Sequence, residues 1–305
     1  MKSLLPLRAL LVTGKGGVGK TTVTASLARF AAAQGKRVLC AEISGEPGAG
    51  SALGAALGVA SLPEEPMRIS DNLSAVLLTP TPGHQKFLRD VLPVRFLADA
   101  AMKSAAIRRF LSAAPTFPEM GVLYRLLDFV RQKDKLGRDL YETIVVDLPA
   151  TGHALALAQI PSSMLRIVPS GPIAAAIREG LELIMDPVRT GTIIVTLPET
   201  LPVSEALELA RGIGQHSIPI ALLFVNRVPL DPFEDHEREI VRALIEKTGP
   251  TLGARTLERI DRARHAVARL ERETKKPIVA LQEVWLEGPS LAEEVASLMG
   301  QATET

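Results

Sequence analysis

Nine consecutive residues near the start of the chain have the composition of a phosphate-binding loop. The pattern G-x-x-x-x-G-K-[ST] is matched by Gly14, Lys15, Gly16, Gly17, Val18, Gly19, Lys20 and Thr21, and Thr22 follows as a second hydroxyl. Glycines allow backbone N–H groups to turn inward around phosphate oxygens, and the N-terminus of a following helix adds partial positive charge. We therefore expect these residues to bind a nucleotide triphosphate, with Lys20 on its β- and γ-phosphates and the Thr21 hydroxyl on Mg²⁺.

A carboxylate at the end of a later apolar run fits the same chemistry. Asp147 ends the run 143–147, where a carboxylate can hold a water bound to Mg²⁺. The predicted metal-site residues are therefore Thr21 and Asp147. The five histidines show no metal-ligand spacing, and a single cysteine, Cys40, excludes a disulfide or a cysteine-only metal site within one chain.

Short apolar runs alternate with longer helical patterns along the chain. Strands are expected at 9–13, 37–43, 73–78, 143–147, 165–168, 192–197, 220–226 and 277–281, and helices at 21–34, 203–213, 234–247 and 256–275 among others. Runs that are apolar on both faces are typical of parallel strands covered by helices on each side. The sequence predicts one α/β domain, 1–305, with a mostly parallel, doubly wound sheet of about seven to eight strands.

The region from about 84 to 135 shows no strand pattern and is too long for an ordinary loop. It is interpreted as a helical insert at the carboxyl edge of the sheet. Its apolar residues either line a groove for an apolar segment or cover the sheet edge and a dimer seam, and we favour the second interpretation. These residues include Phe87, Leu88, Val91, Leu92, Phe96, Leu97, Ile107, Phe110 and Leu111.

The composition excludes some classes of protein. A net charge of +1 argues against a protein that coats nucleic acid. Basic residues on one face of the predicted helix 256–275 share that face with Glu258 and Glu273, so the face is interpreted as solvated. No uninterrupted apolar stretch approaches the roughly 18 residues that a membrane span needs. We therefore expect no integral membrane segment, and we expect a cytoplasmic protein whose Leu-rich start is a core strand.

The other lysine of the loop, Lys15, indicates a narrower class of nucleotide-binding proteins. The form K-G-G-x-G-K-[ST] resembles the signature of the deviant-Walker P-loop ATPases, which include MinD, ParA, the nitrogenase iron protein and the ArsA family. In that group the first lysine reaches across a dimer interface to the partner's nucleotide and acts as an arginine finger does. The resemblance implies ATP or ADP with Mg²⁺, a dimer, and a catalytic role for Lys15. The alternative is a solvated lysine on a loop.

Three later strings resemble the ArsA branch, whose members serve arsenite pumps or target tail-anchored proteins. Residues 147–153 (DLPATGH) resemble D-T-A-P-T-G-H, 196–206 resemble a T-x-P-E…E turn, and 224–227 (FVNR) resemble a strand that ends in an adenine-reading asparagine. The amide of Asn226 offers both a donor and an acceptor to adenine, while a simple turn residue is the alternative. Pro277 and the segment to Gly288 resemble the loop beside adenine. The resemblance covers about Leu7 to Met299.

The chain departs from this family at switch I. There the family has Asp-Pro after the second strand, and that aspartate orients the attacking water. Counted without a gap, the position falls on Ser44, whereas a slip of two residues gives Glu46-Pro47. Glu46 is our catalytic candidate, with Glu42 as an alternative in the Mg²⁺ water shell. Because misplacement by about 1 Å can cost ~10²-fold in rate, ATP binding is a firmer expectation than fast hydrolysis.

The resemblance implies a nucleotide-gated switch. ATP would close a dimer, formed by two copies or with a paralogue, hydrolysis would open it, and an unknown protein client or a membrane partner would respond. One alternative is a positioning ATPase of the MinD or ParA kind, but residues 290–305 contain no lysine or arginine, which is poor for an anionic surface. Another is a weakly hydrolysing subunit of a heterodimer. Nucleic acid is not expected as a partner.

Overall fold

The computed structural model describes residues 1–44, 50–91, 117–149, 165, 170–249 and 252–301. Eight strands form a single sheet in the order β3-β4-β2-β5-β1-β6-β7-β8. Neighbouring strands are parallel except for β3, which runs antiparallel to β4 at one edge. The strands are β1 Ala9–Gly14, β2 Val38–Ile43, β3 Met67–Ser70, β4 Leu73–Leu78, β5 Thr143–Asp147, β6 Thr190–Thr196, β7 Ile220–Val228 and β8 Ile278–Gln282.

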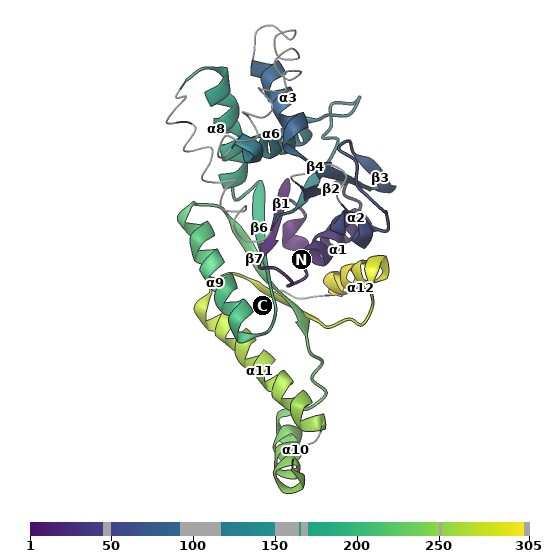
Figure 1. Cartoon of the computed structure of the whole chain (residues 1–305), viewed down its shortest axis with the longest axis vertical. Coiled ribbons are helices and arrows are strands. Elements are labelled where there is room, and N and C mark those ends of the chain that lie inside the picture. Colours follow the sequence, from purple (N-terminus) through teal and green to yellow (C-terminus); the bar gives the residue numbers. More distant parts are fainter. Residues whose placement is uncertain (45–49, 92–116, 150–164, 166–169, 250–251, 302–305) are drawn as a thin grey trace.

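Helices cover both faces of this sheet (Figure 1). The helices α1, α2 and α12 contribute to the core on one face, and α3, α6, α8, α9 and α11 to the core on the other. The α10 helix lies beside one end of α11 and projects away from the sheet. The helices are α1 Lys20–Ala33, α2 Ala52–Leu57, α3 Pro80–Val91, α6 Phe117–Arg131, α8 Pro172–Met185, α9 Thr200–Gln215, α10 Asp235–Thr248, α11 Leu252–Glu273 and α12 Gly288–Gln301, with a short 3-10 helix at Lys2–Leu4.

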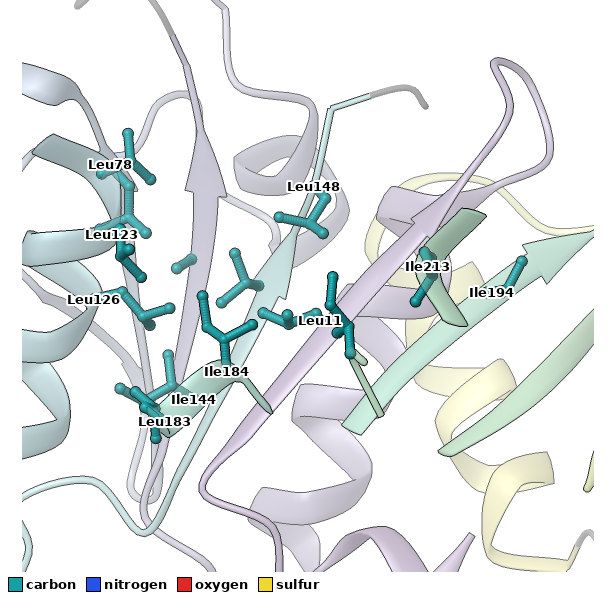
Figure 2. Close-up of a cluster of buried hydrophobic side chains, with 14 of the residues drawn as sticks. Leu11, Leu78, Leu123, Leu126, Ile144, Leu148, Leu183, Ile184, Ile194 and Ile213 are labelled. Atoms are coloured by element: carbon teal, nitrogen blue, oxygen red, sulfur yellow. The ribbon is translucent and has the colours of Figure 1, made fainter. Parts of the chain in front are cut away.

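The central strands are buried on both faces, and successive side chains enter different cores. In β1, Leu10 and Val12 pack with α1 and α12, whereas Leu11 packs on the opposite face. Figure 2 shows Leu11 in that second cluster with Ile144 of β5 and Ile184 of α8. A period of two with apolar residues on both sides is what a parallel sheet between two helical layers requires.

The expected fold class is confirmed, and most element boundaries agree within a few residues. The expected strand 73–78 matches β4, and 143–147 matches β5. The strand β3 was not predicted. Of the expected strand 165–168, only Leu165 lies within the described residues, and it is helical rather than extended.

The described part of the expected insert is the pair of helices α3 and α6. The rings of Phe87 and Tyr124 meet edge to face at 5.2 Å between centroids, and Phe129 is buried below them in the same core. Phe87 thus packs in the core on the sheet, and the choice between a groove and a cover for the sheet edge stays a prediction. Residues 92–116, which include Phe96, Ile107 and Phe110, lie outside the described residues, as do the side chains of Leu88 and Val91.

None of the described helices is both long enough and apolar enough to cross a lipid bilayer.

Two glycines set how closely α3 and α6 approach. A Cβ on Gly83 would lie 1.7 Å from the Gly121 carbonyl oxygen, and a Cβ on Gly121 would lie 2.4 Å from the Pro80 carbonyl oxygen. The obstacle in both cases is backbone, so a methyl group can be accommodated only if the helices separate. We expect Gly83→Ala to lower the free energy of unfolding by about 1–3 kcal/mol, as measured by urea denaturation.

The matched control is Gly214→Ala in α9, where a Cβ would meet no atom within 4 Å. Replacing glycine by alanine in a helix is otherwise favourable by up to about 1 kcal/mol. Equal stability of the Gly83 and Gly214 variants would show that α3 and α6 are not closely packed.

Candidate nucleotide-binding site

The predicted phosphate loop joins the central strand β1 to helix α1. In the sheet, β1 lies between β5 and β6, with Val12 opposite Asp147 and Gly14 opposite Val195. Parallel strands all end at the same edge, so the loops after β1, β2, β5, β6, β7 and β8 gather there. This carboxyl edge is where open α/β sheets bind their ligands.

Two glycines of the loop are required by its geometry. Gly14 has φ 152°, and a Cβ there would lie 2.3 Å from the Val195 carbonyl oxygen of β6. Gly19, which precedes α1, has φ 88°, and a Cβ there would lie 2.4 Å from the Asn226 amide nitrogen. Both residues combine a left-handed or strained backbone with an occupied Cβ position, so only glycine fits.

The structure places the two lysines of the loop in different environments. The Lys20 ammonium donates a hydrogen bond to the Lys15 carbonyl oxygen at 3.0 Å. Partial burial lowers the pKa of Lys20 by removing water from its charge, and the Asp147 carboxylate opposes this effect. The Lys15 ammonium lies outside the loop, 3.4 Å from a carboxylate oxygen of Glu205 in α9.

The Asp147 carboxylate connects the end of β5 to the first turns of α1. The Thr21 hydroxyl donates to its Oδ2 at 2.7 Å, and the Thr24 hydroxyl to its Oδ1 at 3.2 Å. Burial raises the pKa of Asp147, and the nearby Glu42 charge adds to this, while the two hydroxyls and Lys20 lower it. A buried carboxylate beside a hydroxyl and a phosphate loop is a donor set that suits Mg²⁺, so Thr21 and Asp147 fit the predicted metal site.

Thr24 was missed by the sequence reasoning. It lies one helical turn after Thr21, and residues three apart share a face of a helix. Its hydroxyl also lies 2.9 Å from the Lys20 carbonyl oxygen, so two acceptors of the site share its single hydrogen. The threonine spacing 21 and 24 was the available signal.

The alternatives for switch I are only partly within the described structure. Glu46 and the string 150–153, with Thr151, Gly152 and His153, lie outside the described residues. Ser44 follows β2 and donates its backbone N–H to the Leu78 carbonyl oxygen at 3.1 Å. Glu42 caps α2: its Oε2 accepts from the Ser51 hydroxyl, and its Oε1 accepts from Ala52 N–H at 3.1 Å. This use of both oxygens favours a structural role for Glu42 over the Mg²⁺ water shell.

Asn226 lies at the end of β7 and touches the phosphate loop. Its amide nitrogen donates to the Val18 carbonyl oxygen at 3.0 Å, and its amide oxygen accepts from Arg227 N–H at 3.0 Å. The second bond accompanies a left-handed backbone at Arg227, φ 57°, where the pairing of β7 with β8 is irregular. Asn226 therefore supports the loop that binds phosphate, whatever it contributes to the recognition of a base.

The structure does not bring Pro277 to this edge. Its carbonyl oxygen accepts from Leu223 N–H at 2.9 Å, at the start of β8. Asn226 is three residues beyond Leu223, so Pro277 lies on the order of 10 Å from the level of Asn226 along the strand. The residues of the expected adenine loop that do reach the carboxyl edge follow Gln282, and they include Trp285, the one tryptophan of the chain, which is 84% exposed.

A comparison with protein families identifies the chain. The model of a family described as anion-transporting ATPase, the ArsA ATPases, matches residues 7–170, more than half of the sequence. This chain belongs to the anion-transporting ATPase family. The matched part contains the phosphate loop, Thr24, Glu42 and Asp147, whereas Glu205 and Asn226 lie beyond it.

Individual relatives agree with this family. ATPase BagA of Mycobacterium tuberculosis (strain ATCC 25618 / H37Rv) is 29% identical over 226 residues, which cover 72% of this chain and 65% of the relative. An arsenical pump-driving ATPase of Acidiphilium multivorum is 26% identical over 244 residues, 75% of this chain and 40% of its own. ATPase ASNA1 homolog 1 of Paramecium tetraurelia is 32% identical over 158 residues, which cover 52% of this chain and 45% of the relative. The chain thus spans less than two thirds of each of these relatives.

The contact between Asn226 and Val18 predicts how an Asn226→Ala variant of this family member will bind nucleotide. Losing a buried hydrogen bond of this kind costs about 1–3 kcal/mol, so we expect affinity for ATP to fall roughly 5- to 100-fold. If Asn226 supports the loop, tripolyphosphate, which has no base, should lose affinity by the same factor. Isothermal titration calorimetry with both ligands measures this. A loss confined to ATP would instead assign Asn226 to adenine alone.

The raised pKa of Asp147 predicts a trade-off between stability and metal binding. The native state holds the proton of Asp147 more tightly than the unfolded state does. The free energy of unfolding therefore falls as pH rises from about 3.8 through the raised pKa, and above that pKa the contribution of this proton to stability is fully lost. At pH 7, Asp147→Asn should therefore raise the melting temperature of the nucleotide-free protein by roughly 1–3 °C. The same variant should lose the additional stabilisation that Mg²⁺ gives in the presence of ATP.

Thermal unfolding with and without Mg²⁺ and ATP measures both effects. Asp71→Asn is the matched control, because the Asp71 side chain is 94% exposed and its ion pair with Arg68 contributes little. An Asp147→Asn protein that melts below the wild type without nucleotide would contradict the assignment of a desolvated carboxylate.

Proposed function

We propose that the chain binds ATP with Mg²⁺ and hydrolyses it as one P-loop ATPase domain, and that closure of a dimer around ATP acts on a protein or membrane partner. The observation that carries this proposal is the meeting of Lys20, Thr21 and Asp147 at one edge of the sheet. Thr21 and Asp147 are joined at 2.7 Å, although 126 residues separate them in sequence. The relatives' names, which include several ATPases, support the same activity.

The residues of the loop can change partners when a triphosphate binds. An ammonium has three N–H donors, and one of those of Lys20 bonds to the Lys15 carbonyl oxygen, so donors remain for the β- and γ-phosphate oxygens. Thr21 and Asp147 would hold Mg²⁺ between them, directly and through water, and the metal when bound neutralises charge on the phosphate oxygens. Asp147 would then keep its negative charge, because a cation replaces the water that burial removed.

The dimer part of the proposal depends on Lys15. Its side chain is 41% exposed at the carboxyl edge, and its ammonium does not contribute to its own loop. A second subunit facing this edge would receive the ammonium beside its γ-phosphate, where it would stabilise negative charge that develops during phosphoryl transfer. Glu46, which follows β2 in sequence but lies outside the described residues, is proposed to orient the attacking water.

The partner would sense whether the dimer is open or closed. Some relatives are named as ATPases that drive an arsenical pump. We do not extend the arsenical cargo to this chain, since its single cysteine, Cys40, is buried in β2. Our proposal for this chain keeps only the idea that an ATPase drives another protein.

Substitution of the two lysines separates binding from closure. We expect Lys20→Ala to abolish ATP binding, because it removes the cation inside the phosphate loop. We expect Lys15→Ala to bind ATP within a few-fold of the wild type, and to lose ATP-dependent dimerisation and at least ~10²-fold in turnover, in the range found for a lost transition-state donor. Calorimetry, light scattering with size-exclusion chromatography, and phosphate release measure the three properties.

Dimerisation and turnover of Lys15→Ala at wild-type levels would refute the cross-dimer role. Purification of the wild type also discriminates between the two kinds of dimer. A homodimer with steady turnover supports two identical subunits, whereas a monomer that turns over only when a paralogue is added supports a heterodimer.

A further inference from the structure

Lys15 and Glu205 form an ion pair within one chain. The Lys15 ammonium and a Glu205 carboxylate oxygen are 3.4 Å apart, and their side chains are 41% and 29% exposed. The pair joins the first residue after β1 to the second turn of α9. Since β1 and β6 are neighbours and α9 follows β6, the phosphate loop and this part of α9 are held side by side by the sheet.

The ion pair lies at one end of a pocket of about 440 Å³ along α9. Besides Lys15 and Glu205, the pocket is lined by Glu208, Leu209, Arg211 and Gln215, among others. A second carboxylate, Glu208, thus lines the same pocket, but of these two carboxylates it is Glu205 that is within ion-pair distance of the ammonium. Glu205 therefore holds the ammonium toward α9 of its own chain.

The position of the Lys15 ammonium against α9 conflicts with the role that the proposed dimer closure requires of it. An ammonium that stabilises a phosphate on a second subunit cannot at the same time remain against α9 of its own subunit. We propose that Glu205 is a positioning residue that holds Lys15 on its own subunit and releases it when the dimer closes around ATP. The inference rests on the proposed function, and it adds a residue that sets how readily closure occurs.

The effect of Glu205 on the equilibrium between open and closed dimer is expected to be small, because its ion pair with Lys15 is partly exposed. Exposed ion pairs shift equilibria by about two- to five-fold, and salt weakens them. Glu205 should therefore bias the open state by this factor at low ionic strength and by less at 0.5 M salt. A bias of this size is suited to a contact that ATP and a second subunit must overcome in every cycle.

The first test uses the nucleotide-free full chain and does not involve a dimer. Glu205→Gln removes the charge at almost constant shape, and Glu208→Gln is the matched control in the same pocket. Amine acylation by acetic anhydride, followed by mass spectrometry of the peptide that contains Lys15, reports how available this amine is. We expect acylation of Lys15 to be about two- to five-fold faster in Glu205→Gln than in the wild type or in Glu208→Gln. Equal rates in all three proteins would overturn the proposal.

The second test measures closure at low and high salt. The ATP concentration at half-maximal dimerisation should be about two- to five-fold lower for Glu205→Gln than for the wild type, and the difference should shrink at 0.5 M salt. A higher concentration for Glu205→Gln would mean that Glu205 supports the closed state, which overturns the proposal. If Lys15→Ala dimerises and turns over normally, the proposed function fails instead, and the acylation result separately decides whether the ion pair exists.

Discussion

Burial of the Asp147 carboxylate is the interaction on which the rest of the site depends. A charge at the end of a central strand is costly unless it is satisfied, and here the hydroxyls of Thr21 and Thr24 reach it from α1. Those hydroxyls can arrive only if the chain reverses sharply between β1 and α1, and Gly14 and Gly19 permit this reversal. The carboxylate thus fixes the orientation of α1, and with it the direction in which the helix N-terminus and Lys20 face.

The two lysines of the loop are distinguished by their surroundings rather than by their type. Lys20 is half-buried, desolvation lowers its pKa, and its ammonium donates into the loop. Lys15 is more exposed and is tied to α9 instead. In the proposed dimer, Lys15 must reach the nucleotide of the facing subunit. An ammonium that was already hydrogen-bonded inside its own loop, as that of Lys20 is, would not be available for this role.

The sequence predicted those parts of the fold that depend on local pattern. The apolar runs of β4 and β5 defined their ends correctly because both strands are buried, whereas β3 was missed because its residues alternate between half-buried and exposed at the sheet edge. The phosphate loop was recognisable because its residues are consecutive. Pro277 was misplaced because the direction of β8 decides which of its ends lies beside the phosphate loop. The hydrogen bond of Asn226 could not be predicted because it joins residues 208 positions apart in the sequence.

The half of the chain beyond residue 170 completes the nucleotide edge. The family model ends there, yet the phosphate loop is contacted from the later half by Asn226, which bonds to Val18, and by Glu205, which pairs with Lys15. These two contacts act on different sides of the same loop, since one supports its backbone and the other holds its outward lysine. Movement of β7 or α9 would therefore reach the loop directly, without passing through α1 or β5, which carry Thr21 and Asp147. Nucleotide affinity and the proposed dimer closure would therefore depend on different side chains, Asn226 and Glu205.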